Sequence, residues 1–299
     1  MTETDKQPRA MRIGIAGLGR MGSAMAARLL DKGCALAVWT RSNASLDDIM
    51  SRGAQAVPTP AELWNDCDIV LSSLIDDQAL LDVYLGEGGL LCASARGKVA
   101  IDTSTILPET ARLLAKKAAD MGCDFLDSPV LGTSTPARHG QLIAMVGGAF
   151  AAFQRARPIL DLLTRKALHL GDSGAGAAMK LSVNIPMAAY WAAFSESLAL
   201  AAEYGLDMRD VIAIIQDSPA ALAQLPLKLD ILMGKSAQVG FAIDGVVKDL
   251  RVIRTAAGPR LDLPLVDASL ATYAAASDIG AGSEDVAAIA LHHRALHSA

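Results

Sequence analysis

The stretch MRIGIAGLGRMGSAMAARLLDKGCALAVW, residues 11–39, decides the fold of the first half of the chain. Its opening run, Met11–Ala16, is apolar and of strand length, and Ala35–Trp39 is a second such run. Between them, residues 23–32 carry apolar side chains at helical spacing. The order strand, glycine turn, helix, strand predicts one βαβ unit with two parallel strands.

Three glycines, Gly17, Gly19 and Gly22, connect the first predicted strand to the helix. In a GxGxxG turn the first glycine makes the tight turn, the second lets the backbone approach a pyrophosphate, and the third lets helix and strand pack closely. The phosphates then lie at the helix N-terminus, where free amides and the helix dipole favour anions. A purely structural glycine turn is the alternative, but the position between a strand and a helix favours dinucleotide binding.

The residues after the second strand, Thr40, Arg41 and Ser42, indicate which dinucleotide binds. NAD-binding proteins place a carboxylate there to hold the ribose 2′-hydroxyl. This chain has an arginine between two hydroxyls instead, and a guanidinium pairs bidentately with a phosphate. We therefore expect NADP(H) to be preferred over NAD(H), with a solvated loop position for Arg41 as the alternative.

Strand-like runs continue to about residue 170 and then stop. Apolar runs recur at residues 69–71, 99–101, 125–126, 141–146 and 167–170, with a predicted helix at 150–163. After the glycine-rich segment 171–176 the pattern is helical, with a long run at 177–204 that only Pro186 interrupts, and further helices at 208–216, 243–257, 265–277 and 285–296. We predict two domains, 1–172 and 173–299, that pack through the long helix.

The composition bounds the class of protein. The 299 residues are 52% hydrophobic and 20% charged, which excludes a disordered chain and a coiled-coil rod. The net charge of −5 without a basic patch argues against a nucleic-acid partner. No apolar run reaches the roughly 18–20 residues of a membrane span, and the first nine residues are polar, so we expect neither a membrane span nor a signal peptide in this sequence. The four separated cysteines predict buried thiols of a cytoplasmic protein rather than disulfides or a metal site.

Two further loops follow predicted strands. Residues 102–105 (Asp-Thr-Ser-Thr) and 127–133 (Asp-Ser-Pro-Val-Leu-Gly-Thr) each come directly after an apolar run. Open α/β sheets bind ligands at the carboxyl ends of their strands, so hydroxyls and amides in these loops are candidates for substrate contact. For 102–105 a helix cap before Pro108 is an equal alternative. For 127–133 taken alone, a structural turn is favoured.

The spacing Gly174-x-Gly176-x-x-x-Lys180-x-x-x-Asn184 marks the strongest catalytic candidate. Lys180 and Asn184 are four residues apart and therefore share one face of a helix. A lysine among small and apolar neighbours is unfavourable unless it has a partner or faces a cleft. We predict that Lys180 gives a proton to a carbonyl oxygen and that Asn184 orients the substrate. A lysine whose ammonium extends to solvent is the alternative.

Phe241 and the pair Lys248-Asp249 lie in the second predicted domain. Lys248 is a candidate to reach the cofactor or a substrate carboxylate. A surface pair of Lys248 with Asp249 is the alternative that the residues alone leave open.

Together these motifs resemble those of the β-hydroxyacid dehydrogenase family, over about residues 11–293. The family's cofactor motif GLGxMG is similar to residues 17–22, its DxST motif to 102–105, its GxGxxxKxxxN motif to 174–184, and its KDL to 248–250. The resemblance implies an N-terminal Rossmann domain with a doubly wound α/β sheet, then a long interdomain helix and an all-α domain that mediates dimers or tetramers. It also implies hydride transfer between NADP(H) and a small aldehyde or keto acid, or its hydroxyacid.

The resemblance assigns a role to each motif residue. Lys180 and Asn184 are catalytic. The implied cofactor contacts are Gly17, Leu18, Gly19, Arg20, Met21, Gly22, Thr40, Arg41, Ser42, Leu74, Thr103 and Lys248. The implied substrate contacts are Ser104, Thr105, Leu131, Gly132, Thr133, Asn184 and Phe241. We expect no metal, no membrane and no nucleic acid, and a cytoplasmic homodimer or homotetramer that acts on a small molecule.

One loop departs from the family pattern. The family's DAPVSGG reads Asp-Ser-Pro-Val-Leu-Gly-Thr here, so Leu131 stands in place of a serine and Thr133 in place of a glycine. The contact to a substrate anion is therefore open, and the substrate can be bulkier or less polar. Tyr190, Trp191 and Phe194 either line such a pocket or belong to the core.

Two other functions remain as alternatives. Imine reductases share this architecture and the Val-Trp-x-Arg-Ser pattern, but they normally lack a lysine at the position of Lys180. A non-catalytic cofactor-binding protein built on this fold would be expected to lose the lysine, whereas this chain retains Lys180 and Asn184.

Overall fold

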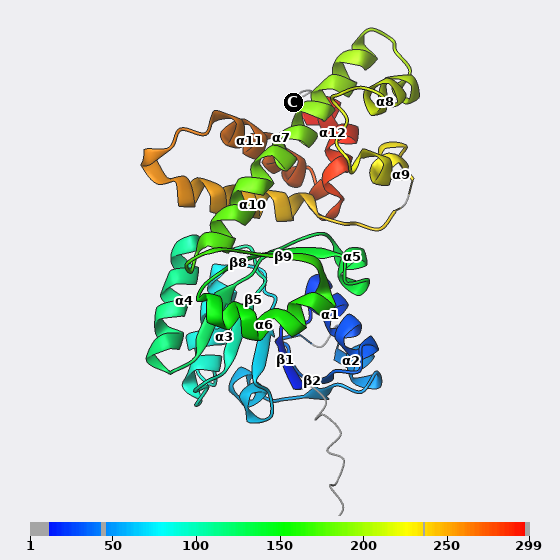
Figure 1. Ribbon diagram of the computed structural model, residues 1–299. Helices are drawn as coiled ribbons and strands as arrows, with labels where there is room; N and C mark the ends of the chain where they lie inside the picture. Colours follow the sequence, from blue (N-terminus) through cyan, green and yellow to red (C-terminus); the bar gives the residue numbers. More distant parts are fainter. Residues whose placement is uncertain (1–11, 43–45, 236, 297–299) are drawn as a thin grey trace, which may run out of the picture. The chain divides into compact units, whose positions relative to one another are not determined.

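The computed structural model describes residues 12–42, 46–235 and 237–296. The chain divides into two compact units, the first ending at Lys180 and the second beginning at Leu181 (Figure 1). The predicted βαβ unit is confirmed as β1 (Arg12–Ala16), α1 (Arg20–Asp31) and β2 (Ala35–Trp39), and its strands are parallel. Helix α1 begins at Arg20, inside the glycine motif, rather than at Ser23, so Gly22 belongs to its first turn. Met11, which we assigned to the first strand, lies outside the described residues.

The first unit is built on one mixed sheet. The strand order is β3-β2-β1-β4-β5-β6-β8-β7, and β9 also pairs with β8. The further strands are β3 (Gln55–Ala56), β4 (Ile69–Ser72), β5 (Val99–Asp102), β6 (Asp124–Asp127), β7 (Val130–Leu131), β8 (Leu142–Gly147) and β9 (Thr164–Gly171). The strands from β3 through β6 are parallel, whereas β8 runs antiparallel to β6. The strand order reverses between β1 and β4, and open α/β sheets bind ligands at the carboxyl ends of such strands.

Helices cover both faces of this sheet. Successive strand residues point to opposite faces, so Ile101 of β5 packs with α1 and α6 (Phe150–Leu163). Its neighbour Ala100 packs with α3 (Asp77–Leu85) and α4 (Pro108–Asp120). The predicted doubly wound α/β sheet is therefore confirmed. The short helices α2 (Leu46–Ser51) and α5 (Ser134–Arg138) were not predicted.

The second unit is helical, as predicted. Helix α7 (Ala175–Glu203) begins in the first unit and continues through Pro186 into the second. It is followed by α8 (Met208–Gln216), α9 (Leu229–Leu232), α10 (Ile243–Ala257), α11 (Pro264–Asp278) and α12 (Ile289–Leu296). Trp191 and Phe194 are buried in the core of this unit, so the core interpretation of these two residues is correct. Tyr190 is only partly buried against the same core.

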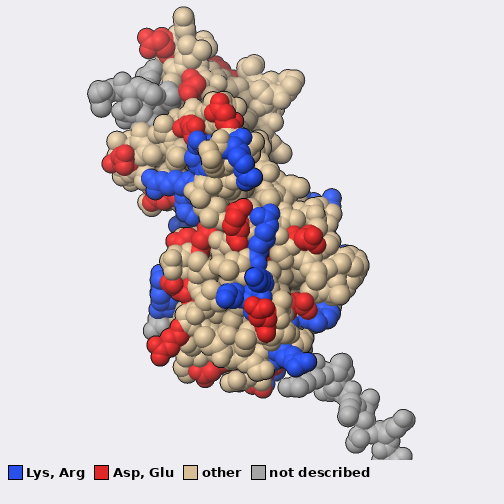
Figure 2. All heavy atoms as spheres, turned by 90° about the vertical axis from the view of Figure 1, so that its left-hand side faces the viewer, with Lys and Arg blue, Asp and Glu red and all other residues tan. Residues whose placement is uncertain are grey.

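The expectations drawn from composition concern surface charge, the cysteines, membrane spans and metal sites. On the face drawn in Figure 2, Lys and Arg side chains lie interspersed with Asp and Glu side chains. All four cysteines are free, but the prediction that all are buried is wrong for Cys92, which is exposed at the end of the short 3-10 helix Leu90–Cys92. Burial raises the pKa of Cys67 and of Cys123 to about 11. Within the described ranges, no helix is long and apolar enough to cross a membrane, and no group of three His, Cys, Asp or Glu side chains is arranged to hold a metal ion.

Candidate active site

The glycine turn after β1 has the geometry of a dinucleotide site. Gly17 has a φ of +97°, a left-handed conformation that side chains disfavour. A Cβ on Gly22 would collide with the carbonyl oxygen of Gly17, so only glycine lets α1 pack this closely. Gly19 is exposed, and a Cβ there would meet no described atom within 4 Å. In this described turn α1 has no side-chain cap and no acidic residue, so its first amides can bind an anion.

Several predicted cofactor residues of the first unit lie in this turn or in the loops after β2 and β4. A Cβ on Gly17 would lie 2.8 Å from the side chain of Leu74, which places the loop after β4 against the glycine turn. Arg41 and Ser42 are exposed after β2, and the Thr40 hydroxyl donates to the Ser42 carbonyl at 2.9 Å. The structure also places Leu18 in the core, Met21 half-buried and Arg20 exposed.

Asp102, at the end of β5, is the centre of a buried hydrogen-bond network. Its Oδ1 accepts from the hydroxyls of Ser72 and Ser104, both at 2.7 Å. The Ser104 hydroxyl also accepts from the Leu74 amide at 2.9 Å, and the Thr103 hydroxyl donates to the Ser72 carbonyl at 2.8 Å. The hydroxyls of Thr103 and Ser104 are thus engaged inside the protein. They tie the loop after β4 to the loop after β5.

The helix-cap alternative for residues 102–105 is wrong. Helix α4 begins at Pro108, as expected for a proline at the first helical position, but its cap residue is Leu107. The cap has no side-chain hydrogen bond in the described structure. Residues 102–105 therefore do not cap α4, and Asp102, Thr103 and Ser104 are buried at the end of β5.

The buried position of Asp102 predicts a pH-dependent stability. Burial raises the pKa of Asp102 to about 6, and hydrogen bonds from Ser104 and Ser72 oppose the rise. Because the folded protein holds this proton more tightly than the unfolded chain, the contribution to stability is complete below pH 4 and is lost as the pH rises through 6. The unfolding free energy of Asp102→Asn, expressed relative to that of the unsubstituted protein, should therefore be about 3 kcal/mol higher at pH 7.5 than at pH 4.

Urea unfolding of the two proteins at both pH values measures this difference. An Asp102→Asn difference in unfolding free energy that stays constant across this range would contradict the raised pKa. Asp262→Asn, at an exposed aspartate, serves as the control and should show no such change.

Asp127, at the end of β6, anchors the beginning of α7. Its carboxylate accepts hydrogen bonds from the amides of Gly174 at 2.8 Å and Ala177 at 2.9 Å. The side chain is fully buried; burial raises its pKa, and the amides oppose the rise. A carboxylate at a helix N-terminus pairs with amides that the helix leaves without partners, and it complements the helix dipole. Asp127 therefore fixes the start of the helix that carries Lys180.

The two glycines of the predicted motif make this approach possible. Gly174 has a φ of +93°, and a Cβ on Gly176 would collide with the carbonyl oxygens of Met145 and Asp127. The glycine spacing therefore reflects the close packing of α7 against β6 and β8.

Lys180 lies beside the loop that departs from the family pattern. It is half-buried, and its Nζ donates to the carbonyl oxygen of Val130 at 2.9 Å. Leu131, the residue after Val130, is half-buried in β7. Gly132 follows with a φ of +122°, and Thr133 precedes α5. Residues 127–133 thus include a short strand as well as the bend at Gly132, and the Val130 carbonyl of this segment binds Lys180.

Asn184 and Lys248, two of the predicted residues of the second unit, meet at one buried carboxylate. Asn184 Nδ2 donates to Asp249 Oδ2 at 2.6 Å, and Lys248 Nζ lies 2.7 Å from Asp249 Oδ1. Asn184 is 5% exposed and Asp249 4%. The Lys248–Asp249 pair therefore exists, but its carboxylate is buried rather than at the surface.

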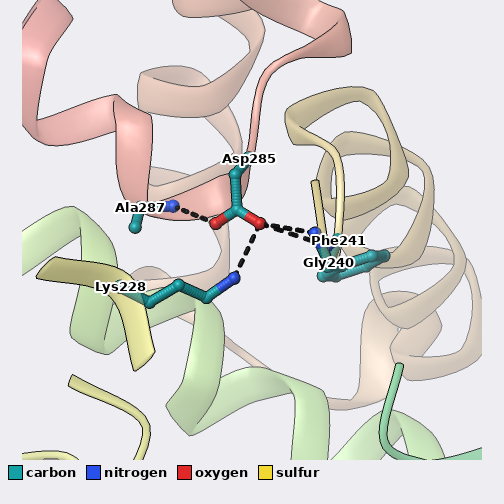
Figure 3. A network of polar contacts seen from close by, with 5 residues as sticks. All are labelled: Lys228, Gly240, Phe241, Asp285 and Ala287. Atoms are coloured by element: carbon teal, nitrogen blue, oxygen red, sulfur yellow. Dashed lines mark hydrogen bonds and ion pairs between the residues drawn. The ribbon is translucent and has the colours of Figure 1, made fainter. Parts of the chain in front are cut away.

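Phe241 is held by a second buried carboxylate, that of Asp285 (Figure 3). Asp285 Oδ2 accepts from Lys228 Nζ at 2.6 Å and from the amides of Gly240 and Phe241 at 2.8 and 3.4 Å. Its Oδ1 accepts from the amide of Ala287 at 3.1 Å. This ion pair and these amides fix the backbone at Phe241.

Sequence reasoning named the neighbours of these buried aspartates but missed their structural roles. Asp127 and Asp285 appeared only as members of a loop and of a helix start. A signal for Asp249 was present, because it falls on the same face of the predicted helix as Val246, Leu250 and Ile253, all of which are buried. A carboxylate on an apolar helix face indicates a buried partner.

A Rossmann sheet with a dinucleotide turn, followed by a helical unit, defines an NAD(P)-binding dehydrogenase. Residues 12–171 match the NAD binding domain of 6-phosphogluconate dehydrogenase. Residues 174–292 match the family described as NAD-binding of NADP-dependent 3-hydroxyisobutyrate dehydrogenase. The chain belongs to the 3-hydroxyisobutyrate dehydrogenase family of NAD(P)-dependent hydroxyacid dehydrogenases and reductases.

Individual relatives agree with this assignment. The chain is 31% identical to glyoxylate/succinic semialdehyde reductase 2 of Arabidopsis thaliana, over 93% of this chain and 78% of that protein. It is 32% identical to 2-(hydroxymethyl)glutarate dehydrogenase of Eubacterium barkeri, over 94% of each chain. The structure of Mycobacterium tuberculosis 3-hydroxyisobutyrate dehydrogenase with L-serine aligns with a TM-score of 0.84 and 25% identity, over 95% of this chain and 99% of that one.

Imine reductases are structural neighbours as well. The Streptomyces aurantiacus imine reductase aligns with a TM-score of 0.63 and 25% identity, over 93% of this chain and 98% of that one. The likeness to 3-hydroxyisobutyrate dehydrogenase is thus the greater of the two.

Proposed function

We propose that this protein is an NADP(H)-dependent reductase of a small aldehyde or keto acid, reversible with the hydroxyacid. Lys180 gives a proton to the carbonyl oxygen as hydride arrives at the carbon, and it accepts that proton in the reverse direction. The observation that carries the proposal is the placement of Lys180. Its helix is anchored by Asp127, and its ammonium lies at Val130, the first residue of β7, shortly after the carboxyl end of β6. The dinucleotide turn after β1 lies at the same edge of the parallel sheet.

The remaining roles follow from this assignment. We propose a cofactor domain over residues 1–172 and a helical domain over 173–299, which the family matches to 12–171 and 174–292 support. Asn184 and the residues around it orient the substrate. A small hydroxyacid or semialdehyde as substrate is supported by the names of the Arabidopsis and Eubacterium relatives.

A panel of carbonyl compounds, followed by NADPH absorbance, tests this function. We expect turnover with semialdehydes or with glyoxylate. Paired substrates with and without a carboxylate show whether Leu131 leaves the anion contact intact. Oxidation of NADPH by cyclic imines alone would favour imine reduction, the alternative that the Leu131 departure and the neighbours keep open.

The cofactor preference has its own prediction. Arg41 is exposed directly after β2, where the adenosine ribose of a dinucleotide binds in this fold. We expect Arg41→Ala to raise the Michaelis constant for NADPH about tenfold or more, because a charge-assisted bidentate contact to the 2′-phosphate is lost. The constant for NADH should change less than twofold, and an equal effect on both cofactors would overturn the preference for NADP(H).

A homodimer or homotetramer is also proposed. Large apolar side chains are exposed in the second unit, namely Leu200, Tyr204, Leu206, Ile214 and Leu227, and exposed apolar surface of this kind supports association. Light scattering of the purified protein measures the number of chains. We further propose a cytoplasmic location, which the four free thiols support.

A further inference from the structure

Asp249 joins two residues that the proposed function places at the site. It lies in α10 with its side chain almost fully buried, at 4% exposure. One carboxylate oxygen accepts from Asn184 of α7 at 2.6 Å, and the other lies 2.7 Å from the ammonium of Lys248. The two oxygens are thus divided between an amide and a cation.

This contact determines the orientation of the Asn184 side chain. A carboxylate only accepts hydrogen bonds, whereas an asparagine amide has one donor end and one acceptor end. If the amide were turned over, its Oδ1 would face a carboxylate oxygen at 2.6 Å, and two acceptors at that distance repel. Asn184 therefore presents its NH₂ to Asp249, and its carbonyl oxygen faces away from the carboxylate.

Burial makes the arrangement energetically demanding. A carboxylate removed from water needs both a counter-charge and hydrogen bonds. Lys248 supplies the charge and Asn184 the hydrogen bond. Loss of either contact would leave the buried Asp249 carboxylate without a partner it needs, so both contacts are expected to persist. The side chain of Lys248 is itself 27% exposed, so its ammonium is not sealed inside.

We propose that Asp249 is a positioning residue, which fixes the orientation of the Asn184 amide and the place of the Lys248 ammonium. The inference rests on the proposed function for the roles of Asn184 and Lys248. It adds a residue that acts through both of them without touching the reacting atoms.

The variant Asp249→Asn distinguishes an effect on the orientation of the Asn184 amide from an effect on the stability of the fold. If Oδ1 of the new amide accepts from Lys248, its NH₂ faces Asn184, which must turn over to present its own oxygen. Hydrogen bonds are kept, but the donor and acceptor ends of Asn184 are exchanged. We expect kcat/KM for the carbonyl substrate to fall about 100-fold, mainly through kcat, as for other misplaced active-site groups.

Tyr273→Phe is the matched control. The Tyr273 hydroxyl donates to the carbonyl oxygen of Ala188, also on α7, at 2.9 Å, and the residue is fully buried. This variant should lower the melting temperature by about 2–4 °C and leave kcat/KM within threefold. A merely structural role for Asp249 predicts the same pattern for Asp249→Asn. An Asp249→Asn enzyme with kcat/KM within threefold of the unsubstituted one would overturn the proposal.

A second measurement does not depend on activity. The chain contains three asparagines, Asn43, Asn65 and Asn184, so ¹⁵N-asparagine labelling yields three pairs of side-chain amide signals. The Asn184 signal is assigned by its loss in Asn184→Ala, and exposed Asn65 is the internal reference. We expect slow exchange of the Asn184 amide with water, and exchange at least tenfold faster in Asp249→Ala.

The two measurements keep the two hypotheses apart. If none of the carbonyl compounds tested supports oxidation of NADPH, the proposed function is disproved. The exchange rate of the Asn184 amide still reports on the role of Asp249 in that case. Exchange at Asn184 as fast as at Asn65 in the unsubstituted protein disproves the fixed orientation, whatever the activity.

Discussion

Lys180→Ala is expected to lower kcat by about 10³-fold to 10⁴-fold while NADPH binds with nearly unchanged affinity. Without the ammonium, the developing charge on the carbonyl oxygen has no proton donor as hydride arrives. The glycine turn and the residues after β2 are untouched, so the proposed cofactor contacts are kept. Stopped-flow turnover measures the first quantity, and NADPH fluorescence measures the second.

Two comparisons decide whether the loss is chemical. Lys166→Ala removes an exposed lysine from β9 in the same unit and should leave kcat unchanged. Addition of a small primary amine should restore part of the activity of Lys180→Ala, because a free amine can supply the missing proton. A Lys180→Ala enzyme with kcat within tenfold of the unsubstituted one would disprove the proposed role of Lys180 as the proton donor.

Gly176→Ala is expected to destabilise the protein by about 3 kcal/mol or more and to lower kcat in the folded fraction. The added Cβ meets the backbone carbonyls of Met145 and Asp127, which cannot move aside as a side chain can. The start of α7 must then shift away from the Asp127 carboxylate, which weakens the bonds to the helix amides. The shift carries Lys180 with it.

Urea unfolding and steady-state kinetics on the same sample test both halves of this prediction. Gly19→Ala is the stability control, because a Cβ there meets nothing among the described residues within 4 Å and the backbone is not left-handed. Its unfolding free energy should change by less than about 1 kcal/mol. Equal stability of the two variants would contradict the close packing inferred at Gly176.

The main elements were predictable because their signals are local. Buried parallel strands are nearly continuous apolar runs, so β2 and the start of β5 were located by composition alone. Helices α8 and α10 begin and end where the helical spacing does. The two-residue strand β3 has exposed side chains and therefore no apolar pattern to detect.

Motifs in the sequence named the residues proposed for the site, but the contacts that hold these residues were not predictable. Lys180 and Asn184 share a motif, whereas the carboxylates that hold them come from far along the chain. Asp127 reaches amides 47 and 50 residues away, and Asn184 reaches Asp249 across 65 residues. No local periodicity encodes such pairings, because they arise only when separate elements pack. The same holds for Val130, whose backbone oxygen carries no side-chain signal at all.

Helix α7 carries Lys180 in one unit and Asn184 in the other without a break. Four residues of helix rise about 6 Å and complete slightly more than one turn. One residue inserted between them would turn the second by about 100° and remove it from the shared face. A recombinant that joins the first part of this helix from one relative to the second part from another must therefore keep three residues between Lys180 and Asn184. Insertions and deletions in this family must lie outside residues 180–184.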